Sequence, residues 1–128
     1  MAKWNETALD YYEATKPQTV MDMVREFVTV TDQTPNTRLY EKLILEEFSE
    51  WVCEKPGTTE GLKELADLVY VCYGYANSIG YDLDEAIARV HENNVGRCIQ
   101  PDGTVKRRED GKIMKNPDYP KVQLEDLI

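Results

Sequence analysis

The chain of 128 residues contains a single histidine, His91, and only three cysteines. The cysteines show no Cys-x-x-Cys spacing and are odd in number, so neither a disulfide framework nor a zinc site is indicated. A di-iron site of the ferritin type requires Glu-x-x-His pairs on two helices. The residue three positions before His91 is Ala88, so this kind of site is excluded.

The sequence also lacks an excess of basic residues and has no long apolar run. Lys and Arg number 15 against 24 Asp and Glu, which gives a net charge of −9. Because nucleic-acid polymers are bound by neutralising their phosphates, we expect no such partner, whereas a small phosphorylated ligand held through a metal remains compatible. No stretch approaches the ~18 apolar residues of a membrane span, and the N-terminus lacks the apolar run of a signal peptide. We therefore expect a cytoplasmic protein without a membrane partner.

Hydrophobic residues at 41% and charged residues at 30% are typical of a globular domain. Helices are predicted over about 20–31, 38–54, 60–78 and 83–94, with a short one over 5–15 that ends before Pro17. Beyond Gly96, the turn dipeptides Asp102-Gly103 and Asp110-Gly111 leave open a small hairpin, an ordered loop or a flexible tail. We predict one all-α domain over 1–128, an antiparallel four-helix-type bundle (core about 20–95) with a short basic C-terminal hairpin or loop (96–128).

The helix predicted over 38–54 carries three acids on one face. At about 100° per residue, Glu46, Glu47 and Glu50 fall within a single arc. Towards the N-terminus this arc continues as Leu43 and Leu39, so the acids extend an apolar stripe. Apolar periodicity therefore assigns these carboxylates to the interior of the bundle.

The next helix repeats this arrangement. Glu60, Glu64 and Asp67 share a face that continues C-terminally as Leu68 and Val71. Two charges ~6 Å apart repel by roughly 3 kcal/mol at an effective dielectric near 20, so an interior carboxylate cluster needs protonation or a cation. Ligands that are all oxygen select Mg²⁺, Mn²⁺ or Ca²⁺. The alternative is that these are ordinary surface glutamates in an acidic protein.

The acids form a pattern that is similar to a known signature. Glu46-Glu47-x-x-Glu50, then after a gap of 13 residues Glu64-x-x-Asp67, resembles the motif of the all-α nucleoside triphosphate pyrophosphohydrolases. That group includes the MazG-like enzymes, the phosphoribosyl-ATP pyrophosphohydrolases and the dimeric dUTPases. Further on, Asp110-Gly111-Lys112-Ile113-x-Lys115 resembles the C-terminal part of the phosphoribosyl-ATP pyrophosphohydrolase-like, MazG-related branch. The likeness covers about residues 20–124.

The resemblance implies a helical homodimer or dimer of dimers that cleaves between the α- and β-phosphates of a nucleotide and releases pyrophosphate. It implies that Mg²⁺, with Mn²⁺ as a possible substitute, is held by Glu47, Glu50, Glu64 and Asp67. It also implies that Glu46 orients or deprotonates the attacking water, although spacing does not distinguish a metal ligand from a base. A metal ion suits this chemistry because it neutralises the polyphosphate and lowers the pKa of bound water.

The resemblance further implies substrate contacts in the C-terminal part: His91, Asn94, Arg97, Lys112, Lys115 and Tyr119. The alternatives are that His91 is a structural histidine and that residues 106–115 form a solvated turn. Asn94 lies on an apolar stripe and is expected to face inward, either as a helix cap or as a ligand contact. The chain reads Asn94-Val95-Gly96-Arg97 where the branch usually reads Asn-Met-Ser-Lys. Arg97 remains able to bind a phosphate, with planar rather than point-charge geometry, which leaves substrate preference open.

The leading interpretation is thus a Mg²⁺-dependent pyrophosphohydrolase acting on (deoxy)nucleoside triphosphates. One alternative is a non-catalytic helical dimer that binds a metal-nucleotide or a partner protein. Another is a purely structural bundle whose acids face water.

Overall fold

The computed structural model of the protein describes residues 7–128. These residues form helices and no strand: α1 (Ala8–Ala14), α2 (Val20–Val30), α3 (Thr37–Val52), α4 (Thr59–Ile79), α5 (Leu83–Gly96) and a 3₁₀ helix, η2 (Glu125–Leu127). The all-α prediction is confirmed. The described residues divide into two compact units, one that ends at Leu83 and one over Asp84–Ile128, so α5 groups with the C-terminal segment. Within 7–128, no helix is long and apolar enough to cross a membrane.

The helices begin and end where local hydrogen bonds satisfy their free backbone groups. The side chain of Thr19 accepts from the Asp22 amide to cap α2, and that of Thr58 accepts from the Gly61 amide to cap α4. Gly80, with φ of 87°, ends α4 in the left-handed conformation that glycine adopts without a steric penalty. The boundaries predicted for the four longer helices are therefore confirmed to within one or two residues. The short helix predicted over 5–15 is observed as Ala8–Ala14, and residues 5 and 6 lie outside the described part of the chain.

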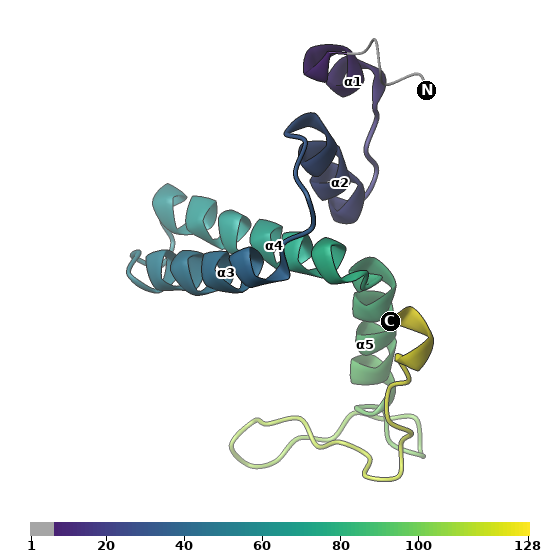
Figure 1. Ribbon diagram of the computed structural model, residues 1–128. Helices are drawn as coiled ribbons and strands as arrows, with labels where there is room; N and C mark the ends of the chain where they lie inside the picture. Colours follow the sequence, from purple (N-terminus) through teal and green to yellow (C-terminus); the bar gives the residue numbers. More distant parts are fainter. Residues whose placement is uncertain (1–6) are drawn as a thin grey trace. The chain divides into compact units, whose positions relative to one another are not determined.

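In the first unit, α3 and α4 lie side by side as a helical hairpin, and α2 packs on α4 (Figure 1). The buried apolar core of this unit is formed by Met21 and Val24 from α2 with Tyr73 and Ala76 from α4. It is a small core, and large apolar side chains on α3 and α4 stay exposed. The buried core joins α2 to α4, whereas α3 packs along α4 mainly through partly buried side chains.

One close contact joins Tyr40 of α3 to Gly74 of α4. The Tyr40 ring is buried and occupies the space in which a Cβ atom at position 74 would lie. Its hydroxyl donates to Gln33 Oε1 at 3.1 Å. Further along the same interface, Ser78 Oγ donates to Thr37 Oγ1 at 3.2 Å. Gly74 thus allows a ring of α3 to rest directly on the α4 backbone.

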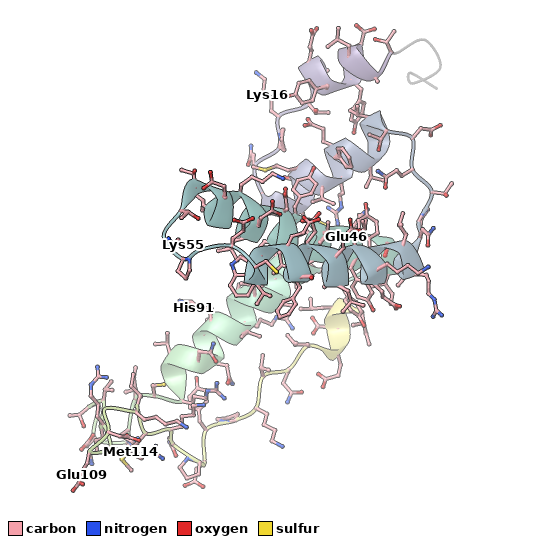
Figure 2. All side chains as sticks on the ribbon, turned by 90° about the vertical axis from the view of Figure 1, so that its left-hand side faces the viewer. Lys16, Glu46, Lys55, His91, Glu109 and Met114 are labelled. Carbon is pink, nitrogen blue, oxygen red and sulfur yellow. The ribbon has the colours of Figure 1, made fainter. Side chains whose placement is uncertain are left out.

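In the second unit, a basic loop spans residues 98–115 between α5 and the C-terminal segment. A single antiparallel bridge joins Arg107 to Ile113, and the Met114 amide donates to the Lys106 carbonyl at 2.8 Å. Glu109 and Met114, labelled in Figure 2, lie in this loop. Of the alternatives left open by the sequence, the structure has a short hairpin-like loop, since the pairing is too brief to form strands.

Candidate functional site

The α3–α4 hairpin brings together three of the predicted acids. Glu47 of α3 meets Glu64 and Asp67 of α4, and one carboxylate oxygen from each lies within 4.8 Å of the others. We call these three residues the acidic cluster. All three are partly buried, because they lie where the two helices face each other. Residues from two separate parts of the sequence thus converge, which the helical pattern alone did not establish.

The acidic cluster contains carboxylate oxygens that have no hydrogen-bond donor within residues 7–128, and its carboxylates repel one another. Glu47 Oε2 and Glu64 Oε2 are both buried without a hydrogen-bond partner among the described residues. Burial raises the pKa of Glu47 above its ordinary value, and the neighbouring carboxyls of Glu50, Asp67 and Glu64 raise it further. Buried carboxylate oxygens that lack donors and repel one another form a donor set suited to a hard divalent cation.

One basic side chain already contacts the acidic cluster. Lys63 Nζ lies 2.6 Å from Asp67 Oδ2 and 3.7 Å from Glu64 Oε1. The hydrogen bond to Asp67 and the surrounding negative charge raise the pKa of Lys63. Among the described residues, three carboxylates outnumber this one ammonium, so the cluster retains negative charge. Sequence reasoning missed Lys63, although its spacing of four residues from Asp67 on one helix is a signal for an ion pair.

The other two acids of the motif lie outside the acidic cluster. Glu50 is exposed on α3, near enough to Glu47 to raise its pKa. Glu46 is also exposed (labelled in Figure 2). The predicted interior position is therefore wrong for Glu46 and Glu50 within this chain. At ~100° per residue, Glu46 and Glu50 lie ~100° and ~60° from Glu47 around the helix, so only Glu47 of the three faces α4 directly.

The raised pKa of Glu47 predicts a pH dependence of stability. The pKa of this carboxyl is raised above its ordinary value of 4.5 in the folded state. Its contribution to stability is therefore fully present below pH 4.5 and is lost as the pH rises through the raised pKa. We expect the free energy of unfolding of the metal-free protein to fall over this range. Urea denaturation in a chelating buffer, repeated between about pH 4 and pH 8, measures it.

Glu47→Gln is the matched variant for this measurement. The difference in unfolding free energy between the variant and the wild type should widen, in favour of the variant, as the pH rises. Saturating Mg²⁺ should reverse this advantage, because a bound cation would stabilise the ionised carboxylate. A difference that stays constant with pH would contradict the raised pKa.

In the second unit, the structure pairs two predicted substrate contacts with each other. Asn94 is exposed, and its Oδ1 accepts from Arg97 Nη2 at 2.8 Å. The expected inward position of Asn94 is therefore wrong within this chain. Arg97 is partly buried, and its Nε has no hydrogen-bond partner among the described residues. The carbonyl oxygen of Arg97 accepts from the Asn116 amide at 2.6 Å.

The remaining predicted contacts are exposed. His91 lies on α5, and Lys112 and Lys115 lie in the basic loop. Tyr119 packs against Gly96, with its ring in the space that a Cβ atom at position 96 would occupy. Gly96 stands where the related branch usually has serine, and the absence of a side chain at this position leaves room for the Tyr119 ring.

The phosphoribosyl-ATP pyrophosphohydrolase family matches residues 16–94, which is more than half of the chain and includes the whole acidic cluster. The chain belongs to this family. A search of curated proteins found no match.

Membership in the phosphoribosyl-ATP pyrophosphohydrolase family indicates a hydrolase that acts on pyrophosphate bonds. The predicted all-α pyrophosphohydrolase relationship is confirmed. The matched region ends at Asn94, so the basic loop and the C-terminal segment lie beyond it.

Proposed function

We propose that the protein is a divalent-metal-dependent pyrophosphohydrolase that cleaves (deoxy)nucleoside triphosphates between the α- and β-phosphates. The observation that supports this proposal is the acidic cluster, in which two buried carboxylate oxygens lack partners. Such a donor set favours a hard cation, and the family indicates pyrophosphate-bond hydrolysis. The products are a nucleoside monophosphate and pyrophosphate.

In this proposal Glu47, Glu64 and Asp67, with Glu50 nearby, hold Mg²⁺, and Mn²⁺ can replace it. A divalent ion supplies neutralisation of the polyphosphate charge and lowers the pKa of bound water. Glu46 is proposed to orient the attacking water or to accept its proton. The Glu46 carboxylate is exposed on α3, and within residues 7–128 it forms no ion pair.

The proposed phosphate contacts are cationic side chains of the second unit, namely Arg97, Lys112 and Lys115. Their charge complements the phosphate oxygens, and the two lysines are exposed and free to reorient. His91, Asn94 and Tyr119 are proposed as contacts to the rest of the nucleotide, since their polar groups donate or accept hydrogen bonds.

The direct test is a substrate panel. The purified protein is incubated with Mg²⁺ and ribo- and deoxyribonucleoside triphosphates, and also with phosphoribosyl-ATP because of the family. Release of pyrophosphate together with the monophosphate is expected, and phosphorus NMR distinguishes it from release of phosphate. Cleavage of phosphoribosyl-ATP alone would correct the substrate. A folded protein that is inert towards the whole panel with both Mg²⁺ and Mn²⁺ would reject the enzymatic function.

We also propose that the chain self-associates as a homodimer or a dimer of dimers. The α3–α4 hairpin exposes apolar side chains at helical spacing: Leu45, Phe48, Val52, Leu62, Leu65 and Val69. A patch of this kind is unfavourable in water, and a second copy of the hairpin supplies a matching apolar surface.

Leu62→Glu should therefore shift the protein towards the monomer, since Leu62 is 68% exposed and a buried carboxylate at an interface is costly. Light scattering coupled to size exclusion measures the mass. Val105→Glu adds the same charge at an exposed apolar residue of the basic loop and should leave the mass unchanged. A wild-type protein that is monomeric at high concentration would contradict self-association.

A further inference from the structure

One face of α5, from Arg89 to Arg97 just past the end of the helix, is attached to the C-terminal segment. The residues on this face recur every four positions, so they lie above one another on the helix: Glu85, Arg89, Asn93 and Arg97. Near the end of α5, the Arg97 carbonyl accepts from the Asn116 amide. One turn earlier, Asn93 Nδ2 donates to the Pro120 carbonyl at 2.8 Å. The returning chain thus runs antiparallel to α5 and is fixed at each turn.

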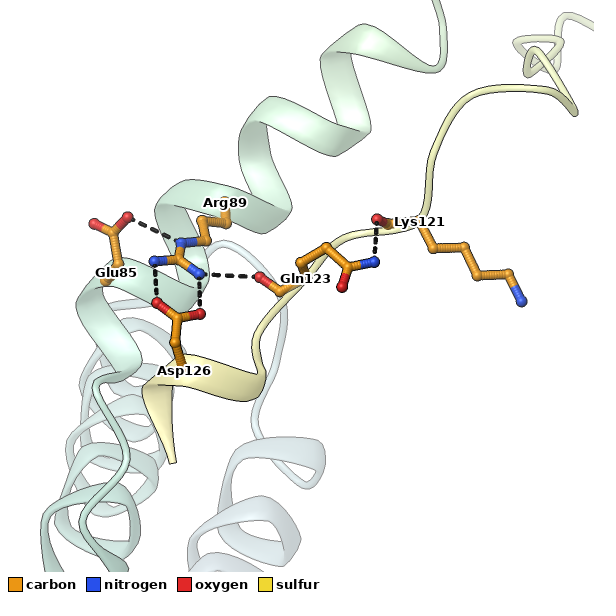
Figure 3. A network of polar contacts seen from close by, with 5 residues as sticks. All are labelled: Glu85, Arg89, Lys121, Gln123 and Asp126. Carbon is orange, nitrogen blue, oxygen red and sulfur yellow. Dashed lines mark hydrogen bonds and ion pairs between the residues drawn. The ribbon is translucent and has the colours of Figure 1, made fainter.

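Arg89 makes the most extensive of these attachments (Figure 3). Its Nη1 and Nη2 bind the two carboxylate oxygens of Asp126 at 2.6 and 2.9 Å. Its Nε donates to Glu85 Oε1 at 3.1 Å, and Nη1 also donates to the Gln123 carbonyl at 3.1 Å. The hydrogen bond from Arg89 is the main cause that lowers the pKa of Asp126 below its ordinary value. We call Arg89 and Asp126 the clip.

The geometry of the clip differs from that of an ordinary surface ion pair. A single exposed pair contributes little, but a bidentate guanidinium–carboxylate pair within a network is the stronger exception. The Arg89 side chain is only 29% exposed, because Gln123 and η2 cover it. The clip also joins residues 37 positions apart, so it closes a long loop instead of reinforcing a single helix.

The loop enclosed by these attachments carries most of the positive charge of the second unit. Lys106, Arg107, Arg108, Lys112 and Lys115 all lie in it, and every residue from 101 to 115 is exposed. With no buried side chain of its own over that stretch, the loop has little apolar packing to fix its position. Its placement depends on the anchors at its two ends, since each unanchored residue gains conformational entropy.

We propose that the clip positions the basic loop for binding a polyphosphate, with Arg89 and Asp126 as positioning residues that do not touch the ligand. This inference rests on the proposed function for the identity of the ligand. A loop held in place binds phosphate with a smaller loss of entropy than a loop that must first be ordered. The clip therefore acts on phosphate affinity and leaves the acidic cluster unaffected.

The test compares the full-length wild type with Arg89→Gln, with Asp126→Asn and with the exchanged pair Arg89→Asp/Asp126→Arg. Trypsin cleavage within residues 98–121, followed by mass spectrometry, reports the mobility of the loop. Calorimetry with magnesium pyrophosphate reports phosphate affinity without requiring turnover. Glu92→Gln, an exposed residue of the same helix outside the network, is the control.

Trypsin should cleave the loop of each single variant faster than that of the wild type. Each single variant should also bind pyrophosphate about fivefold more weakly, the factor that corresponds to losing one network ion pair. The exchanged pair should recover most of both effects, and Mg²⁺ affinity should be unchanged throughout. On active protein, KM should rise with kcat unchanged.

Faster cleavage with unaltered pyrophosphate affinity would overturn the positioning role, because the clip would then be structural only. Failure of the exchanged pair to recover would overturn the pairing of the two residues. If the wild-type protein binds pyrophosphate but hydrolyses no triphosphate, the proposed function is rejected. The pyrophosphate affinities of the variants then still decide whether the clip positions the loop.

Discussion

Glu64→Gln is expected to abolish turnover and to weaken Mg²⁺ binding by at least about 100-fold, since even partners outside the ligand shell contribute about 10–100-fold. The substitution preserves the shape of a side chain whose Oε2 is buried and unpartnered. It removes one of three charges whose oxygens lie within 4.8 Å. Calorimetry with Mg²⁺ and pyrophosphate release from a triphosphate measure the two effects.

The same variant should be more stable than the wild type in the absence of metal. Charges about 5 Å apart repel by roughly 3 kcal/mol at a dielectric of 20, and solvent screening reduces this to a gain of about 1 kcal/mol at partly exposed positions. Stability that rises while metal affinity falls distinguishes a metal site from a structural role, because loss of a structural residue lowers both.

Glu41→Gln is the matched control for Glu64→Gln. Glu41 is an exposed glutamate of α3 outside the acidic motif, so its substitution should alter neither Mg²⁺ affinity nor turnover. Retention of metal affinity and activity by Glu64→Gln would show that the acidic cluster is not the metal site.

Gly74→Ala should destabilise the protein by about 2 kcal/mol, since forcing extra atoms into a packed interface costs typically about 1–3 kcal/mol. The added methyl group would overlap the buried Tyr40 ring. Because the Tyr40 ring is buried, we expect α3 and α4 to move apart to relieve this overlap, which would also separate Glu47 from Glu64 and Asp67. We therefore expect a second effect, weaker Mg²⁺ binding, although position 74 is seven residues from the nearest acid of the cluster. Urea denaturation and calorimetry measure the two effects.

A double-mutant cycle with Tyr40→Leu tests the cause. If the ring is the obstacle, Gly74→Ala should cost less in the Tyr40→Leu background than in the wild type. Ser49→Ala, at an exposed position of α3, should change stability by no more than about 0.5 kcal/mol. Equal costs of Gly74→Ala in both backgrounds would contradict the packing explanation.

Much of the fold was predictable because its signals are local. Thr19 and Thr58 cap helices through amides three residues further on, and Gly80 ends α4 through its own backbone conformation. Each of these features depends on neighbours along the chain, so the sequence contains everything needed to recognise them.

The site was predictable only in part. The spacing of the acids indicated two acidic helices, but it did not show that Glu47 faces α4 while Glu46 and Glu50 stay exposed. Asn94 was expected inside and lies exposed, because the apolar stripe of α5 is not covered within the second unit.

Sequence alone determined the helical content, the helix boundaries and the presence of two acid-bearing faces, since these follow from contacts between near neighbours. The tertiary structure decided which carboxylates meet, that Tyr40 rests on Gly74, and that Arg89 binds Asp126. Such contacts join residues far apart in the chain, and their partners are selected by how whole helices and segments pack. No periodicity within one helix encodes that choice, because the rotation of a helix about its axis is fixed only by the surface it packs against.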